Sequence, residues 1–347
     1  MRILGIETSC DECSAAVVED GRRILSNVIA TQIPFHAEYE GVVPEIASRK
    51  HTEWIPRVVR EALDGAGVSA EDIGGVAVTV KPGLVGSLLV GLSFAKAWAW
   101  ALGKPLVGVN HILAHLYAPL LSEDVDYPFL GLLVSGGHTL ICRAEGFDDI
   151  AVLGTTIDDA VGEAFDKTAK YYGFGYPGGL AIDRLARKGD PAACRFPSPN
   201  LYKGEHRYDV SYSGLKTAAI RQLDQFWDPA YPRTPENIAA AFEKAAVDLL
   251  LSRLERAVED TGLTTVVAGG GVAANTYLRA RLAGWTGLRA LFPPLELCGD
   301  NGAMVAGIGF KYLERGDRDG LDLNASPRVP IFRRLDKPGR TRNAAGS

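Results

Sequence analysis

An internal duplication constrains the fold of this chain more than any other feature of its sequence. Residues 3–29 read as three short apolar runs separated by tight polar turns, and residues 129–153 repeat that order. Such runs are typical of short strands joined by tight turns. In both halves a helical stretch, a strand, a glycine-rich loop, a helix and a further strand follow. The sequence predicts a helix over residues 44–66 in the first half. In the second half it predicts one long helix with Thr234 as its N-cap, Pro235 at its first position and Gly262 at its end. Two copies of one such unit predict an α/β fold with two mixed sheets, flanking helices and a ligand cleft between the halves.

The two copies differ in length. Gly5 aligns with Gly131, an offset of 126 (131 − 5), whereas Val76 aligns with Val266, an offset of 190 (266 − 76). The second copy therefore holds about 64 more residues (190 − 126). Most of them fall in a stretch rich in Pro, Arg and Tyr, which we interpret as an insertion.

These offsets divide the chain into two lobes. We expect an N-terminal lobe over residues 1–125 and a C-terminal lobe over residues 126–347. The extra residues predict an insertion at about 189–233. A basic tail from Leu321, with six Lys or Arg against two Asp, ends the second lobe.

Composition and charge exclude several other kinds of protein. The 347 residues are 47% hydrophobic, enough for sizeable cores, and the formal net charge of −5 argues against a protein that coats nucleic acid. No uncharged apolar run reaches the roughly 18 residues of a membrane span, and the N-terminus has no room for the apolar part of a signal peptide. Five cysteines, a sparse and odd number, fit a reducing compartment. We therefore expect a cytoplasmic globular protein.

Two histidines stand four residues apart in the string VNHILAHLY. If this stretch is helical, the imidazoles of His111 and His115 project from one face about one turn apart, which suits the capture of a transition metal. The alternative is a pair of structural histidines. The pair does not form the HExxH motif of metalloproteases, because Ile112 occupies the position of the glutamate.

A third metal ligand would have to come from another part of the chain, and Asp300 in LCGDNGAM is the best candidate. Two histidines and one carboxylate with open positions suit Fe²⁺, or Zn²⁺ with a bound water. Asp300 stands where a loop turns into a helix, so its alternative role is to cap that helix. In a duplicated fold, this helix entry and the histidine pair can both face the central cleft.

Four glycine-rich loops stand at matching points of the two copies. Glycine lets backbone N–H groups approach an anionic or planar ligand closely, so the set favours a nucleotide cleft over four plain turns. The chain contains neither the phosphate-binding P-loop motif nor the GxGxxG motif of dinucleotide folds. The loops are KPGLVG (81–86), SGGH (135–138), YPGG (176–179) and GGGVAAN (269–275).

Polar residues near these loops have both ordinary and functional interpretations. Acidic residues on a helix usually form a solvated face, but Asp166 and Asp183 could instead accept hydrogen bonds from a ligand. Cys10 and Cys13 form a lone CxxC, which we interpret as turn residues rather than a zinc or redox site. A basic stretch with interleaved tyrosines is either a solvated surface or an RNA-contacting patch. Its members are Arg184, Arg187, Lys188, Arg195, Tyr202, Lys203, Arg207, Tyr208, Tyr212 and Lys216.

Taken together, strings along this sequence closely resemble the TsaD family, also called Gcp or YgjD, of tRNA adenosine threonylcarbamoyltransferases. They occur in order over residues 3–307 and cover nearly the whole chain. The strings are GIETSCDE, GVVPEIASRKH, PGLVGSLLVG, NHILAH, LLVSGGHT, IDDAVGEAFDKTAK, YPGG, VSYSGLKT, GGGVAAN and CGDNGAM.

The resemblance implies a duplicated fold of the kind found in actin, Hsp70 and sugar kinases. It implies that His111, His115 and Asp300 bind one divalent metal ion, with Fe²⁺ preferred and Zn²⁺ or Mg²⁺ as alternatives. The residues that it assigns to the adenylate substrate are Leu133, Val134, Ser135, Gly136, Gly137, Asp166, Gly179, Asp183 and Asn275.

The reaction implied by the resemblance transfers a threonylcarbamoyl group from threonylcarbamoyl-adenylate to N6 of a tRNA adenosine. That adenosine lies just 3′ of the anticodon in tRNAs that read codons beginning with A, and AMP is released. The amine is a poor nucleophile, so a base is expected, and His138 and Asp11 are the candidates. The implied partners are the TsaB paralogue and the ATPase TsaE, with a TsaC or Sua5 type of enzyme supplying the adenylate.

The chain departs from the family pattern at two places. Lys81-Pro82-Gly83 stands where members often have GPG. Many members carry a Glu between the two histidines, where this chain has Ile112 and Leu113, so we expect a supporting carboxylate to be missing there. Three other functions stay open as alternatives: a metalloprotease, a small-molecule kinase or ATPase of the same fold, and a non-catalytic scaffold resembling TsaB.

Overall fold

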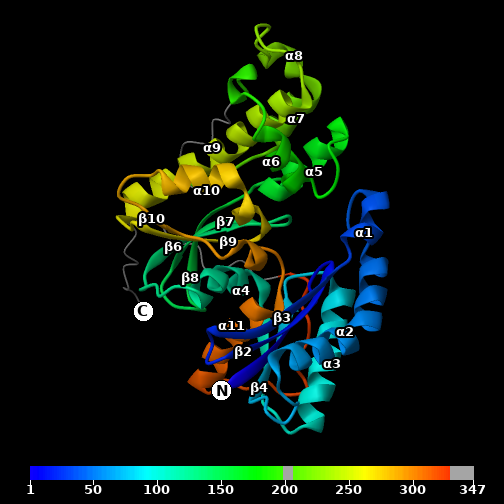
Figure 1. The fold of residues 1–347 in the computed structure, drawn as a ribbon. Helices are drawn as coiled ribbons and strands as arrows, with labels where there is room; N and C mark the ends of the chain where they lie inside the picture. Colours follow the sequence, from blue (N-terminus) through cyan, green and yellow to red (C-terminus); the bar gives the residue numbers. More distant parts are fainter. Residues whose placement is uncertain (198–205, 329–347) are drawn as a thin grey trace, which may run out of the picture.

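The computed structural model describes residues 1–197 and 206–328, which form two similar halves (Figure 1). The predicted insertion is therefore described in part. Tyr202, Lys203 and the tail from residue 329 lie outside the described residues. Each half contains a five-stranded sheet in which three strands run antiparallel to their neighbours and two more are added in parallel.

The two sheets share one topology. The first has the strand order β3-β2-β1-β4-β5, and the second has the equivalent order β8-β7-β6-β9-β10. The strands of the first sheet are β1 (Arg2–Glu7), β2 (Glu12–Glu19), β3 (Arg23–Thr31), β4 (Gly75–Lys81) and β5 (Leu106–Asn110). Those of the second are β6 (Phe129–Val134), β7 (Thr139–Ala144), β8 (Ile150–Thr155), β9 (Thr265–Gly269) and β10 (Arg289–Leu291).

The register of the strands repeats as well. Leu4 of β1 lies opposite Val76 of β4, and Leu130 of β6 lies opposite Val266 of β9. These two pairs are related by the offsets of 126 (130 − 4) and 190 (266 − 76) expected from the sequence. The predicted duplication of an α/β unit with a mixed sheet is confirmed.

Two long helices cover one face of the first sheet. α2 (Pro44–Ala66) begins with a proline at its first position and ends at Gly67, whose φ of 64° suits glycine, and these are the predicted bounds. α3 (Val85–Ala101) follows the KPGLVG loop. Both pack on the sheet around an apolar core. The short α1 (Ile33–His36) and η1 (Ala37–Tyr39) lead from β3 to α2.

The helices of the second half surround a second apolar core on its sheet. The longest, α9 (Pro235–Thr261), begins after Thr234, whose hydroxyl accepts a hydrogen bond from the Asn237 N–H, and ends at Gly262. Both ends agree with the predicted cap, first-position proline and terminal glycine. The other helical segments are α5 (Val161–Tyr172), α6 (Gly178–Ala186), η3 (Pro191–Ala193), α7 (Ser213–Arg221), α8 (Leu223–Phe226), η5 (Gly271–Ala274) and α10 (Thr276–Ala283).

Two helices cross between the halves. α4 (His111–Tyr117) follows the last strand of the first sheet, and α11 (Gly302–Arg315) follows the last strand of the second. α4 contacts β6 and β9 of the second sheet, whereas α11 lies on the first sheet. The two helices also contact each other, and with η2 (Ala118–Leu121) and η6 (Leu295–Leu297) they form a core shared by both halves. Figure 1 shows them between the two sheets.

Glycines let both crossing helices approach the sheets closely. A Cβ atom at Gly5 would lie 2.2 Å from the carbonyl oxygen of Gly302, and a Cβ atom at Gly269 would lie 2.2 Å from that of His115. The backbone of α11 therefore rests on β1, and the backbone of α4 rests on β9. This packing brings the N-terminal ends of the two helices together in the middle of the molecule.

Candidate metal centre and nucleotide cleft

The predicted metal ligands come together where the two crossing helices begin. His111 and His115 both lie on α4, which confirms that the HxxxH string is helical. Asp300 Oδ1 lies 3.0 Å from His115 Nε2 and 3.6 Å from His111 Nε2. One ligand atom from each of the three residues lies within 4.8 Å of the others. Two imidazole nitrogens and one carboxylate in this arrangement fit a divalent transition metal and leave coordination positions open.

Asparagines, rather than Asp300, cap the two helices. Asn110 precedes α4 and accepts a hydrogen bond from the Ile112 N–H, and Asn301 precedes α11 and accepts one from the Met304 N–H. The alternative role of Asp300 as the cap of the following helix is therefore wrong. Since the neighbouring Asn301 satisfies the helix end, the Asp300 carboxylate is left to face the two imidazoles.

A buried carboxylate that the sequence analysis missed supports His111. Glu7, at the end of β1, is fully buried, and its Oε2 lies 3.0 Å from His111 Nδ1. Thr79 on β4 donates to the same oxygen at 2.7 Å, and the Ser9 N–H donates to Oε1 at 2.6 Å. Although Ile112 and Leu113 replace the expected Glu between the histidines, a supporting carboxylate is present from another element. In the sequence Glu7 is only a single charged residue at the end of the apolar run ILGIE, which does not indicate this contact.

The electrostatics of the centre favour a positive charge. Burial opposes protonation of His111, but the Asp300 and Glu7 carboxylates outweigh burial and raise its pKa to about 9. Burial and the neighbouring His111 lower the pKa of His115. Burial alone would raise the pKa of Asp300, but the two imidazoles hold it well below its usual value. A cation between two carboxylates is the charge arrangement that a bound divalent metal would satisfy.

The two candidate bases lie in the equivalent first turns of the two halves. His138 follows the SGG loop, and burial together with His111 and His115 lowers its pKa to about 4, so it is neutral at pH 7. Asp11 lies buried in the turn between β1 and β2. Burial is the main cause that raises the pKa of Tyr176 and of Asp166, and the negative charge of Asp11 adds to it. Asp11 therefore faces these two residues of the second half.

Two of the glycine-rich loops adjoin one another. The Ser135 N–H donates to the His138 carbonyl, and the Ser135 hydroxyl accepts from the His138 N–H at 3.1 Å, which closes the SGG turn after Leu133 and Val134. Gly270, with a φ of 95°, packs so closely that a Cβ atom would lie 2.3 Å from the Val134 carbonyl oxygen. By contrast, Cβ atoms at Gly136, Gly137 and Gly271 would meet none of the described residues within 4 Å. Their backbone is open to a ligand.

The other substrate candidates form hydrogen bonds within the second half. Asp166 accepts from the Gly178 N–H at 2.7 Å, next to Gly179. Asp183 accepts from both the N–H and the hydroxyl of Thr276, at 2.7 and 2.6 Å, and pairs with Arg187. Both carboxylates thus join helices, which the alternative of a solvated helix face did not anticipate.

Both polar atoms of the Asn275 side-chain amide form hydrogen bonds. Its Oδ1 accepts from the Leu278 N–H at 2.9 Å and caps α10, and its Nδ2 donates to Glu243 at 2.6 Å. Burial raises the pKa of Glu243 to about 7, since the hydrogen bond from Asn275 only partly opposes it and Asp183 adds to it. Glu243, on α9, was missed by the sequence analysis because nothing local distinguishes it from a core-facing helical position.

The remaining motifs have ordinary roles in the described chain. Cys10 lies in the turn after β1, as predicted, whereas Cys13 lies in β2, so its interpretation as a turn residue is wrong. Both cysteines are free, and burial raises the pKa of the Cys13 thiol to about 12. In the basic stretch, Arg207 pairs with Asp260 and Lys216 pairs with Asp159. No helix of the described residues is long and apolar enough to span a membrane.

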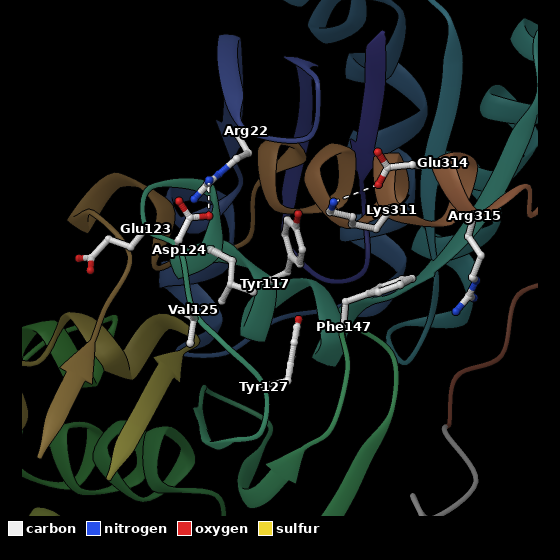
Figure 2. A pocket seen from close by; sticks show the side chains of 11 residues that line it. Arg22, Tyr117, Glu123, Asp124, Val125, Tyr127, Phe147, Lys311, Glu314 and Arg315 are labelled. Carbon is white, nitrogen blue, oxygen red and sulfur yellow. Dashed lines mark hydrogen bonds and ion pairs between the residues drawn. The ribbon is translucent and has the colours of Figure 1, made fainter. Parts of the chain in front are cut away.

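Figure 2 shows a pocket of about 470 Å³ away from these groups, with lining residues from both halves. Tyr117, Tyr127 and Phe147 form its aromatic part, and Arg22 and Arg315 lie at its edges. None of the predicted metal or substrate residues lines this pocket.

The repeated mixed sheets and the helices that flank them and cross between them define a two-lobed protein of the actin-like ATPase fold. Full-length HypF, in a phosphate- and nucleotide-bound crystal structure, is similar with a TM-score of 0.60 at 15% identity, over 92% of this chain and 47% of HypF. Component A of the Acidaminococcus fermentans (R)-2-hydroxyglutaryl-CoA dehydratase is similar with a TM-score of 0.56 at 14% identity, over 90% of this chain and 99% of that one. The predicted fold class is confirmed.

The sequence matches are more specific than the fold. The model of the TsaD family, tRNA N6-adenosine threonylcarbamoyltransferase, matches residues 23–307. A protein of that name from Treponema denticola is 62% identical over 96% of this chain and 98% of its own length. Another, from Borreliella burgdorferi, is 50% identical over 96% of each chain. The chain belongs to the TsaD family.

Proposed function

We propose that this protein transfers the threonylcarbamoyl group of threonylcarbamoyl-adenylate to N6 of a tRNA adenosine and releases AMP. The adenosine is the one 3′-adjacent to the anticodon in tRNAs that read codons beginning with A. One observation carries the proposal: a chain of this family holds His111, His115 and Asp300 together beside an open glycine backbone. Such a backbone suits an adenylate, and such a ligand group suits a Lewis acid next to it.

The proposed cofactor is one divalent metal ion held by those three residues. Two imidazoles favour Fe²⁺, with Zn²⁺ as the second choice, whereas Mg²⁺ prefers a set of oxygen ligands. When bound, the ion supplies electrostatic stabilisation of the negative charge that develops during acyl transfer.

The chain's own residues would bind the adenylate and exclude water. Backbone N–H groups of Gly136 and Gly137 would hold the AMP part, since Cβ atoms at these positions would meet none of the described residues within 4 Å. Leu133, Val134 and Ser135 would shape the turn that presents them, because the Ser135 N–H already donates to the His138 carbonyl. Opposite it, Gly179 and Asn275 would complete the site. Asp166 and Asp183 would share their oxygens between ligand hydroxyl groups and the protein donors described above.

Proton removal from the attacking amine needs an acceptor in the same cleft. His138 is one candidate, because its imidazole is neutral at pH 7 and lies near the proposed metal ligands, although a pKa of about 4 makes it a weak base. Asp11 is the second, because it faces the same space from the other half. Replacing each by a non-basic amide of similar size, His138→Gln and Asp11→Asn, would distinguish the two candidates in single-turnover assays.

The need for partners follows from charge, and their identities follow from the resemblance to the TsaD family. The net charge is −5, and several cations of the basic stretch already pair with acids, so recruitment of tRNA would rely on other proteins. We propose the TsaB paralogue and the ATPase TsaE as those partners, with a TsaC or Sua5 type of enzyme as the source of the adenylate. Five free cysteines fit the cytoplasm as the place of this reaction.

A reconstitution assay tests the proposed function. The protein, its partners, threonine, bicarbonate, ATP and unmodified tRNA are incubated, and the digested RNA is searched for threonylcarbamoyladenosine. Asp300→Ala should lower the yield at least about 100-fold, because it removes a first ligand of the proposed Lewis acid. The exposed Asp64→Asn is the matched control. A normal yield from Asp300→Ala, or a metabolite phosphorylated without tRNA, would contradict the proposal.

A further inference from the structure

We propose that Glu7 is a positioning residue for the metal centre. It accepts the Nδ1–H of His111 and so fixes the imidazole in the tautomer and orientation that present Nε2 to Asp300 and to a bound cation. The inference rests on the proposed metal site of the preceding section, and it assigns the retention of the metal to a residue that does not itself coordinate it.

The surroundings of Glu7 leave its carboxylate little freedom. It is fully buried at the end of β1. The Ser9 N–H at 2.6 Å holds Oε1, and the Thr79 hydroxyl at 2.7 Å holds Oε2. Oε2 also lies 3.0 Å from His111 Nδ1, and the Ser9 hydroxyl oxygen lies 3.2 Å from the same nitrogen. The Ser9 N–H and the Thr79 hydroxyl both donate to the Glu7 carboxylate, so a proton on His111 Nδ1 gives this carboxylate a third donor. With its proton on Nδ1, the imidazole leaves Nε2 free to act as a metal ligand.

The second imidazole has no comparable support. His115 Nδ1 is buried and has no hydrogen-bond partner among the described residues. Its orientation therefore comes from packing on α4 and from the contact of its Nε2 with Asp300. Of the two histidines on α4, His111 therefore has a hydrogen-bond partner for its Nδ1 atom and His115 has none among the described residues. The loss of Glu7 would change the orientation and tautomer of His111 and leave those of His115 unchanged.

An isosteric amide at position 7 cannot replace the carboxylate. If its NH₂ group took the place of Oε1, two donors would face each other across the 2.6 Å gap to the Ser9 N–H. If it took the place of Oε2, His111 Nδ1 would have to accept, and the imidazole proton would move to Nε2, into the position of the cation. Both arrangements weaken metal binding with almost no change in volume.

The experiment measures metal affinity directly. Zn²⁺ binding to wild type and to Glu7→Gln is followed by competition with a chromophoric chelator, and the folding of each metal-free protein is checked by circular dichroism and thermal unfolding. We expect Glu7→Gln to bind Zn²⁺ about 10- to 100-fold more weakly, the usual effect of removing such a support. The matched control is Glu243→Gln, the same exchange at a buried glutamate of the other half, which should leave Zn²⁺ affinity unchanged. An unchanged affinity of Glu7→Gln, or an equal loss in both variants, would overturn the proposal.

A second measurement needs only the wild-type protein. In the Co²⁺-loaded form, metal-bound imidazoles give strongly shifted ring N–H resonances in the proton NMR spectrum. We expect one such signal, absent in His111→Ala, to exchange slowly with D₂O because Glu7 accepts that proton. The absence of a slowly exchanging signal from His111 would contradict the proposal even if Glu7→Gln did not fold.

The two proposals fail in different ways. If wild type binds Zn²⁺ more tightly than Glu7→Gln but forms no threonylcarbamoyladenosine, the proposed function is wrong and the role of Glu7 stands. If wild type modifies tRNA, Asp300→Ala does not, and Glu7→Gln binds Zn²⁺ normally, the role of Glu7 is wrong and the function stands.

Discussion

The first turn of each half occupies the same place in its sheet, yet the two turns have opposite chemistry. Glu7 pairs with Ser14 across β1 and β2, and Leu133 pairs with Leu140 across β6 and β7, so the turns correspond residue for residue at an offset of 126 (133 − 7). The first turn, TSCDE, carries two acids, whereas the second, VSGGH, exposes bare backbone. The two copies therefore share one backbone path but differ in side chains: the first turn places acids beside the proposed metal site, and the second exposes the backbone proposed to bind the adenylate.

A similar contrast holds for the buried glutamates of the two halves. Glu7 has three donors around it, and although burial opposes ionisation, the adjacent His111 lowers its pKa. Glu243 has one donor, Asn275, and burial raises its pKa to about 7. A carboxylate that is surrounded by donors stays charged in the core, whereas one with a single neutral donor resists ionisation.

The largest expected effect comes from equivalent glycines under the crossing helices. A Cβ atom at Gly5 would lie 2.2 Å from the backbone of Gly302, whereas one at Gly131 would first meet the Cys142 Sγ at 2.6 Å. We expect Gly5→Ala to lower the free energy of unfolding by more than about 3 kcal/mol and Gly131→Ala by about 1 kcal/mol, because a side chain can move and a helix backbone cannot. Urea denaturation measures both. Equal losses would show that the two crossings are packed alike.

The next effect is the pH dependence of the free energy of unfolding that the raised pKa of Glu243 causes. A pKa raised to about 7 in the folded state means that the folded protein keeps a proton on Glu243 that the unfolded chain, with its model value of 4.5, has lost. Stability therefore falls as pH rises between these values. Glu243→Gln removes this loss, so at pH 8, compared with pH 4.5, it should gain roughly 2–3 kcal/mol over wild type. Denaturation at both pH values measures the difference, and a constant difference would contradict it.

The third effect concerns the proton on His111 that a metal ion must displace in order to bind. In the metal-free protein the pKa of His111 is raised to about 9, so the imidazole is protonated at pH 7. Metal affinity should then rise about tenfold per pH unit below pH 9 and level off above it. Chelator competition between pH 6.5 and 8.5 measures this slope. A flat profile would mean that His111 does not hold a positive charge before the metal binds.

The smallest effect concerns the bare turn of the second half. A Cβ atom at Gly136 meets open space, so Gly136→Ala should leave the free energy of unfolding within about 0.5 kcal/mol of wild type. The added methyl group would lie where the adenylate is proposed to bind, and we expect the KM for the adenylate to rise about fivefold. Gly271→Ala, in the adjoining loop, provides a parallel case. A KM unchanged in both variants would argue against adenylate binding at this backbone.

Much of this architecture is encoded locally. The ends of α2 and α9 were predicted because a proline, a capping threonine and terminal glycines stand at their bounds. The duplication and the histidine pair were visible because their spacing repeats or matches a helical turn. These signals survive in a single sequence because they depend on neighbours along the chain.

What could not be predicted depends on contacts between distant residues. Glu7 meets Thr79 and His111 only after three strands of the first sheet have paired, and a lone Glu at a strand end carries no sign of that. Nothing in the string GDNGAM shows that Asn301, one residue after Asp300, is the cap. That α11 returns to the first sheet follows from packing against Gly5, which no local pattern reports.

The crossing of α4 and α11 has a consequence for the history of the chain. One copy of the repeat contributes both imidazoles, and the other contributes the carboxylate opposite them. An ancestor made of a single copy would have contained only one side of this group of three residues. The metal site that we propose could then arise only after duplication, once each copy packed its last helix on the sheet of the other.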